Sequence, residues 1–184
     1  MADSSITKRA LAQAMKDLMA KQPFAKISVG DICETCGMNR KSFYYHFRDK
    51  YDLVNWIFYS EFLASVQAAE CGSSWDFLKN ICYYFYSQRS FYRNALRIEG
   101  QNSFQDYFRE MVIPTLMYLS KDLLSPNDDE QFVVTFVGDA LLASLIRWLT
   151  DPTPLPPDEY LSKVRTLLTD LSKIVQDPPQ MHGF

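Results

Sequence analysis

Glycine and histidine are scarce in this sequence, and both shortages limit the chemistry that it can carry. The six glycines are never clustered, and no G-x-G-x-x-G or Walker pattern occurs, which excludes a glycine-rich phosphate-binding loop. The two histidines are His46 and His182, and we find no Ser/His/Asp or Cys/His arrangement and no paired carboxylates suited to catalysis. We therefore predict that the chain is not an enzyme, and we expect neither a cofactor nor a metal ion.

Cysteine and long apolar runs are also sparse. The four cysteines include a single C-x-x-C, at Cys33 and Cys36, so two packing thiols are favoured over a metal site or a redox pair. The first residues lack the basic and apolar regions of a secretory signal, which predicts a cytoplasmic protein. The most apolar stretch, 132–149, contains Asp139 and Arg147, and it therefore indicates a buried helix and not a membrane span.

The composition is that of an ordinary globular protein with an uneven distribution of charge. The 184 residues can form one large domain or two small ones packed together. The net charge is -3, but residues 1–50 carry nine Lys and Arg against five acids, whereas residues 51–184 carry ten against seventeen. A basic segment joined to an acidic remainder indicates a nucleic-acid-binding part attached to something else.

The apolar residues recur with helical spacing along nearly the whole chain, which predicts an all-α fold of about nine helices. Ser4 and Ser5 are candidate caps of the first helix, and Pro23 ends it. Later helices are expected at 74–88, 91–98, 103–123, 128–149 and 157–175. Pro114 should kink or split the helix over 103–123.

Residues 28–50 carry the pattern of a helix-turn-helix. Ser28 and Asp31 form a capping box before a short helix that ends at Gly37, and Asn39 can cap a second short helix through about Tyr45. In a helix-turn-helix the second helix lies in the major groove of DNA. The alternative is a helical hairpin with a solvated basic face.

The side chains of the second helix suit this role. Arg40 and Lys41 stand at its start, where arginine can bind guanine through O6 and N7. Tyr44, Tyr45, His46 and Lys50 follow, with groups suited to phosphate oxygens.

The run from Ile27 to Leu53 resembles the DNA-binding signature of TetR-type transcriptional regulators. Its marks are the capped first helix, Gly37, Ser42, the Tyr44-x-His46-Phe47 cluster and Lys50. The sequence of residues 39–57 further resembles that of the subgroup of dihydroxyacetone-kinase regulators. In one branch of this subgroup, a partner protein switches the regulator. Cys36 departs from the usual Ala or Leu of the family.

The family resemblance implies a division of the chain and a set of contacts. It implies a DNA-binding domain over residues 1–48, an effector and dimerisation domain over 49–184, and a homodimer formed by the last two helices. It further implies that Tyr44, His46 and Lys50 contact the DNA backbone, while other residues face the groove. The groove-facing residues are Asn39, Arg40, Lys41 and Tyr45, and Ser28 and Ser42 complete the candidate DNA-binding set.

Residues 75–118 are rich in aromatic side chains and arginines, and two interpretations stay open. The aromatic residues can line a small-molecule pocket or form a core. Arg89, Arg93, Arg97 and Arg109 can hold an anion, or they can be solvated or paired with acids such as Glu99 and Asp106.

The helices expected at 128–149 and 157–175 suit a dimer interface. The first is apolar nearly all round and the second has a leucine-rich stripe, so two copies could bury both in a four-helix bundle. Gly138, Ala143 and Ser144 would permit close approach. A purely intramolecular core is the alternative.

These observations predict a homodimeric regulator that binds a palindromic site on double-stranded DNA. Its switch would be a small molecule or a partner protein that binds to or docks on the helical body. The alternative is a co-regulator or interaction protein whose body binds another protein and has no small-molecule pocket. The sequence leaves open the operator, the regulated genes and the sign of the regulation.

Overall fold

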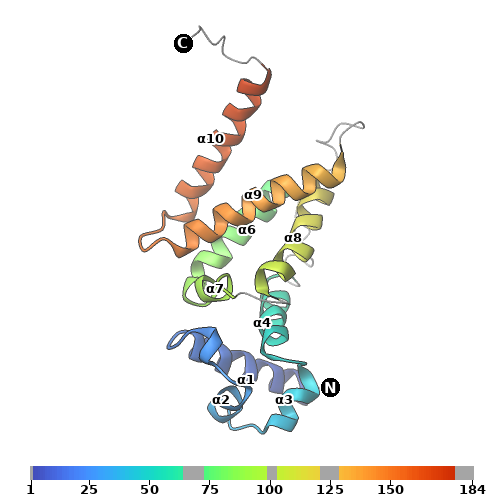
Figure 1. Cartoon of the computed structure of the whole chain (residues 1–184), viewed down its shortest axis with the longest axis vertical. Coiled ribbons are helices and arrows are strands. Elements are labelled where there is room, and N and C mark those ends of the chain that lie inside the picture. Colours follow the sequence, from blue (N-terminus) through green and yellow to red (C-terminus); the bar gives the residue numbers. More distant parts are fainter. Residues whose placement is uncertain (1, 64–72, 99–102, 121–128, 177–184) are drawn as a thin grey trace.

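The computed structural model of the chain describes residues 2–63, 73–98, 103–120 and 129–176. Within them it is all-helical, with nine α-helices, as the sequence predicted. A small group of helices, the head, lies at one end of the long axis, and a larger group, the body, makes up the rest (Figure 1). None of the described helices is long and apolar enough to span a membrane.

The head contains α1 (Ala2–Met19), the short 3₁₀ helix η1 (Phe24–Lys26), α2 (Val29–Thr35) and α3 (Arg40–His46). Leu11 and Met15 of α1, Ile32 of α2 and Phe43 of α3 are fully buried and hold the three helices together. Because α1 begins at Ala2, Ser4 and Ser5 lie within the helix and do not cap it.

A continuous helical segment joins the head to the body. It consists of α4 (Lys50–Phe58), which Asp49 caps, and the π-helical turn η2 (Tyr59–Leu63). Leu53, Val54 and Ile57 are fully buried. The segment packs against α1 on the head side and against α8 on the body side.

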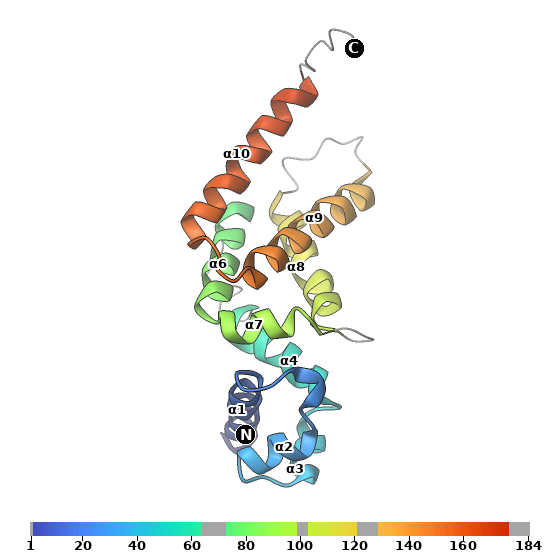
Figure 2. The same cartoon turned by 60° about the vertical axis from the view of Figure 1, so that its left-hand side comes forward.

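The body contains α6 (Ser74–Ser87), α7 (Arg89–Ala95), α8 (Phe104–Ser120), α9 (Glu130–Thr150) and α10 (Pro157–Gln176). These match the five expected helices to within a few residues. Pro114 does not split α8, which runs through it. Short α7 lies between the head and the other body helices, and α9 and α10 diverge from their connecting loop (Figures 1 and 2).

Buried aromatic side chains of α4, α6, α7 and α8 form the core of the body. Phe58, Phe85, Tyr92, Phe104 and Phe108 are buried, and their rings contact one another at centroid distances between 4.3 and 6.3 Å. For these side chains the core interpretation is therefore confirmed, and edge and offset ring packing supplies much of the body's cohesion.

Gly138 corrects one detail of the expected dimer interface. A Cβ at this position would lie 2.3 Å from Cδ1 of Ile113, so Gly138 permits close contact between α9 and α8 of the same chain. Ala143 and Ser144 are exposed on α9 and stay available to a partner.

Candidate functional site

The first helix of the helix-turn-helix begins with the predicted capping box. The Ser28 hydroxyl accepts a hydrogen bond from the Asp31 backbone N–H at 3.2 Å, and the Asp31 carboxylate accepts one from the Ser28 backbone N–H at 2.8 Å. The Ser28 hydroxyl also donates to the Asp31 carboxylate at 2.8 Å, and the two bonds that the carboxylate accepts from Ser28 lower the pKa of Asp31. Ser28 is therefore a structural cap, and any contact with DNA would be an additional role.

The turn and the second helix also form as predicted. Gly37 has a φ of 69°, a left-handed conformation that other residues rarely adopt. The Asn39 side-chain oxygen then accepts a hydrogen bond from the Ser42 backbone N–H at 2.8 Å and caps α3. Because Phe43 is fully buried, the rotation of α3 about its axis is determined by the core of the head.

This rotation exposes the predicted groove-facing side chains. Asn39, Arg40 and Lys41 are exposed, and Tyr45, at 81%, is the most exposed large hydrophobic side chain among the described residues. Tyr44, predicted to contact the DNA backbone, is also exposed. The ring of His46 packs edge-on against that of Tyr45, with 4.9 Å between centroids. Two adjacent exposed tyrosines beside an exposed lysine form a contiguous surface that fits a binding role.

Five of the nine candidate residues line one groove between α1 and α3, with a volume of about 510 Å³. They are Asn39, Lys41, Ser42, Tyr45 and His46. Ser4 and Thr7 of α1 line the same groove, and neither is among the DNA-binding residues predicted from the sequence. Ser4 and Thr7 are more than thirty residues from α3 in the sequence, so their proximity to it could not be predicted from local patterns. The one available signal was the pair of hydroxyl residues before Lys8, which is typical of a helix that faces phosphates.

Arg40 and Lys50 lie against backbone. The Arg40 guanidinium packs on Gly30 at the start of α2, where an added Cβ would lie 2.7 Å from Nη2. The Lys50 ammonium donates hydrogen bonds to the carbonyls of Phe24 at 2.8 Å and Ile27 at 2.7 Å, and it approaches the Ala25 carbonyl at 3.4 Å. An ammonium has three donors, so a phosphate would share it with these carbonyls.

Burial lowers the pKa of Lys50, while the nearby Asp31 carboxylate raises it.

The two cysteines of the head behave as packing residues. Burial raises the pKa of both Cys33 and Cys36, which leaves them as unreactive thiols.

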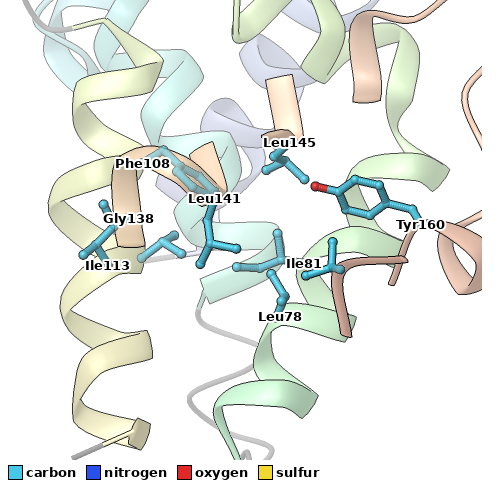
Figure 3. Close-up of a pocket in the computed structure, with 10 residues that line it drawn as sticks. Leu78, Ile81, Phe108, Ile113, Gly138, Leu141, Leu145 and Tyr160 are labelled. Carbon is cyan, nitrogen blue, oxygen red and sulfur yellow. The ribbon is translucent and has the colours of Figure 1, made fainter. Parts of the chain in front are cut away.

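A small apolar cavity lies among the described residues of the body. Its volume is about 20 Å³, close to the space that one water molecule occupies. The labelled lining residues come from α6, α8, α9 and α10 (Figure 3). They are Leu78, Ile81, Phe108, Ile113, Gly138, Leu141, Leu145 and Tyr160.

Two of the four arginines proposed to hold an anion have partners within the chain. Arg109 pairs with Asp139 at 2.9 Å and with Asp106 at 3.6 Å. Arg89 donates hydrogen bonds to backbone carbonyls at the end of α9. The pairing interpretation is confirmed for Arg109, including its predicted partner Asp106.

Models of two known protein families match this chain. The model described as "Bacterial regulatory proteins, tetR family" matches residues 8–57, which include the whole helix-turn-helix. The model described as "Transcriptional regulator C-terminal region" matches residues 73–170, more than half of the chain. The chain belongs to the TetR family. It is a DNA-binding transcriptional regulator and not an enzyme.

Individual relatives agree with this assignment. The dhaKLM operon transcriptional activator DhaS of Lactococcus lactis is 40% identical over 62 residues, which span 34% of this chain and a third of that protein. A solved structure of the dihydroxyacetone kinase operon activator DhaS has a TM-score of 0.66 at 22% identity and covers 92% of this chain and 97% of its own.

A second solved structure is similar in fold to this TetR-family chain. NalD of Pseudomonas aeruginosa, the secondary repressor of the MexAB-OprM multidrug efflux pump, has a TM-score of 0.67 at 19% identity. It covers 92% of this chain and 97% of its own. The two solved structures are named as an activator and a repressor, so the shared fold does not determine the sign of the regulation.

Proposed function

We propose that the chain acts as a homodimer that binds a palindromic operator through α3 of each head. The observation that carries this proposal is the exposed face of α3, where Tyr44, Tyr45 and Lys41 stand clear of a packed core. Two recognition helices about 34–36 Å apart reach successive major grooves on one face of DNA. In this proposal Tyr44, His46 and Lys50 contact phosphates, and the caps Ser28 and Asn39 position the helices. Arg40, Lys41, Ser42 and Tyr45 face the groove.

Selection of duplexes from a random DNA library tests the operator. We expect the chain to enrich a palindrome whose half-sites lie about one helical turn apart. The DhaS relatives are named for a dihydroxyacetone kinase operon, so the promoters of such genes are the first natural sequences to footprint. Enrichment of a single half-site, or of no sequence, would contradict the proposal.

The dimer is supported by apolar side chains on α9 and α10 that no described part of the chain covers. Phe132 and Phe136 stack on each other on α9 while 65% and 66% exposed, and Leu167 and Leu168 are more than half exposed on α10. Figures 1 and 2 show α10 projecting away from α9. An amphipathic helix in this position needs an apolar partner, and a second copy offers the same faces.

Sedimentation of a matched pair of variants tests the interface. Phe136→Asp puts a charge on the proposed interface, and we expect it to yield monomers at micromolar concentration. Ile6→Asp is the control, because Ile6 is 63% exposed but lies on α1 of the head. A Phe136→Asp protein that still sediments as a dimer would exclude this face.

We further propose that the effector docks on the surface of the body and does not fill the cavity of Figure 3. Small-molecule sites have volumes of about 300–1,000 Å³. The volume of the cavity between α8, α9 and α10 is far smaller, at about 20 Å³. The small volume of this cavity supports an effector that docks elsewhere on the body, as a partner protein would.

A cavity-filling variant tests this choice. Val112 is buried and lines the cavity, so Val112→Ile would occupy space that an internal ligand needs. In a reporter strain that carries the selected operator, we expect Val112→Ile to respond to the inducing condition as the wild type does. A lost response, with normal DNA binding, would favour an internal ligand.

A further inference from the structure

Gly30 stands in a helix whose backbone does not require a glycine. It is the second residue of α2, and Gly37 is the one described glycine with a positive φ, so the backbone at position 30 would accept other residues. Glycine also lowers the stability of a helix relative to alanine. The structure accounts for Gly30 by the side chain that lies against it.

That side chain belongs to Arg40, the first residue of α3. A Cβ atom at position 30 would lie 2.7 Å from Nη2 of Arg40, closer than van der Waals contact, and 3.5 Å from Cζ. The guanidinium therefore lies across the first turn of α2, in the space that a larger residue at position 30 would fill. Figures 1 and 2 show α2 and α3 together at the end of the molecule opposite α10.

The side chain of Arg40 lies outside the groove between α1 and α3. Its neighbours Asn39 and Lys41 line that groove, and Arg40 does not. The rotation of α3 is determined by buried Phe43, so this division between the two sides of the helix is set by the core of the head. The start of α3 thus presents Arg40 beside α2 and Lys41 beside α1.

A fixed negative charge holds the guanidinium beside α2. The Asp31 carboxylate accepts hydrogen bonds from the backbone N–H and the hydroxyl of Ser28, both at 2.8 Å, so the capping box fixes its position. Those two bonds are the main causes that lower the pKa of Asp31, and the positive charges of Arg40 and Lys50 lower it further. Contact with Gly30 and attraction to Asp31 therefore place the guanidinium on the same side of α3.

The guanidinium keeps its capacity for hydrogen bonding. It donates no hydrogen bond and forms no salt bridge to any residue in the described part of the chain, and Arg40 is exposed. Arg89 and Arg109, in contrast, donate to carbonyl and carboxylate oxygens. The planar fork of arginine matches a pair of acceptors on one partner, such as O6 and N7 of guanine or two oxygens of a phosphate.

We propose that Gly30 is a specificity-determining residue, because its missing side chain lets the Arg40 guanidinium lie across α2 in the orientation from which it binds one guanine. Gly30 is the positioning residue, and Arg40 is the residue that touches the base. The inference rests on the proposed function, in which α3 enters the major groove. A side chain that is already held in place loses less conformational freedom on binding than a mobile arginine, and it offers its donors in one direction.

Replacement of Gly30 by alanine separates this role from a role in folding. The new methyl group would displace the end of a flexible side chain, and its other near neighbour, the Ser28 hydroxyl, is less close at 3.3 Å. Alanine also favours a helix more than glycine does. We therefore expect Gly30→Ala to melt at the wild-type temperature or above it, whereas loss of a structural residue lowers the melting temperature.

Base preference is measured on the full-length protein. The probes are the duplex that the wild type selects from a random library and its variants, with each base pair changed in turn in both half-sites. Arg40→Ala identifies the base pair that Arg40 reads, where we expect the wild type to prefer guanine by about 5- to 150-fold. We expect Gly30→Ala to lose most of this preference and to keep those at other base pairs. The control is Thr35→Ala, exposed at the other end of α2, which should keep all of them.

The double variant of Gly30→Ala with Arg40→Ala tests whether the effect passes through Arg40. We expect it to have the same base preferences as Arg40→Ala alone, because the new methyl group then has no guanidinium to displace. A further loss in the double variant, or unchanged preferences in Gly30→Ala, would overturn the inference and leave the proposed function intact. A fall in melting temperature shared by Gly30→Ala and the double variant would also overturn it, since the methyl group would then disturb the backbone.

Two other outcomes concern Arg40 and the operator. If Arg40→Ala weakens binding to every duplex by the same factor, its guanidinium contacts a phosphate, and the inference fails although operator binding stands. Selection of no palindrome by the wild type would refute the proposed function and the inference with it.

Discussion

Replacement of Lys50 by methionine is the most informative single test of how the head is built. The stem of the side chain remains, and the ammonium is removed from the carbonyls of Phe24 and Ile27. These carbonyls lie in the segment between α1 and α2, so the bonds bring the chain before the helix-turn-helix against the start of α4. We expect Lys50→Met to loosen this segment and to lower the stability of the head.

The size of the effect can be worked from the contacts. Both bonds are short and charge-assisted, and such bonds contribute about 1.5–3 kcal/mol each. The Phe24 carbonyl keeps a second donor, the Ile27 backbone N–H at 3.0 Å, which reduces its loss. The ammonium also lies 4.3 Å from the centre of the Phe24 ring, a cation–π contact of about 0.5–1 kcal/mol. We expect a net loss of about 2–3 kcal/mol in the free energy of unfolding.

Thermal melting monitored by circular dichroism measures this loss. For a chain of this length, about 2–3 kcal/mol lowers the melting temperature by about 4–12 °C. Lys41→Met is the matched control, because Lys41 is exposed on α3 and has no such carbonyls to hold. Its melting temperature should stay at the wild-type value, because this substitution removes a donor from no backbone carbonyl.

A wild-type melting temperature for Lys50→Met would refute this reasoning, since the two carbonyls would then contribute nothing. The salt dependence of the same variant tests the separate prediction that Lys50 contacts a phosphate. A slope reduced by about one would support that contact.

Three further predictions concern the recognition helix, the body and the effect of pH. Arg40→Ala should relax the preference at one base pair of the selected operator at a cost of about 1–3 kcal/mol, and equal loss on random duplexes would contradict base readout. Gly138→Ala should destabilise the chain by about 1–3 kcal/mol in urea titrations, because the new methyl group overlaps Ile113. The double variant with Ile113→Ala should not show this overlap, so equal effects in both backgrounds would argue against it. Burial raises the pKa of Tyr92, so the folded chain keeps a proton that the unfolded phenol, with a pKa of about 10, loses. The free energy of unfolding should therefore fall as the pH rises above about 10, and Tyr92→Phe should reduce that dependence by up to about 1.4 kcal/mol per pH unit. An unchanged dependence in Tyr92→Phe would mean that this phenol ionises in the folded chain.

Local signals were sufficient for the helix-turn-helix. The capping box of Ser28 and Asp31, the turn at Gly37 and the cap at Asn39 involve residues within four positions of one another, so their geometry follows from backbone hydrogen bonding alone. The exposure of Tyr45 follows in turn. Residues two positions apart lie on nearly opposite sides of an α-helix, so burial of Phe43 leaves the ring of Tyr45 outside the core.

Contacts between distant segments could not be predicted in the same way. Gly138 was predicted to lie in a dimer interface, but the packing of α8 against α9 places it on Ile113 of the same chain. Lys50 was predicted to contact phosphate, whereas the fold also brings its ammonium to carbonyls more than twenty residues earlier. Helical spacing did not decide whether the aromatic residues of the body line a pocket, because buried and ligand-lining rings have the same spacing along a helix.

The amino-acid sequence by itself determined the all-α class, the position of the helix-turn-helix and the separation of a basic head from an acidic body. Each of these depends on neighbouring residues, through helical periodicity, capping and local charge. The tertiary structure alone decided that aromatic side chains pack into the body core, that the apolar cavity beside α9 has a volume near that of one water molecule, and that α7 contacts both α1 and α9. Those features depend on how side chains from distant segments fill shared space, and periodicity along one helix does not specify its partner.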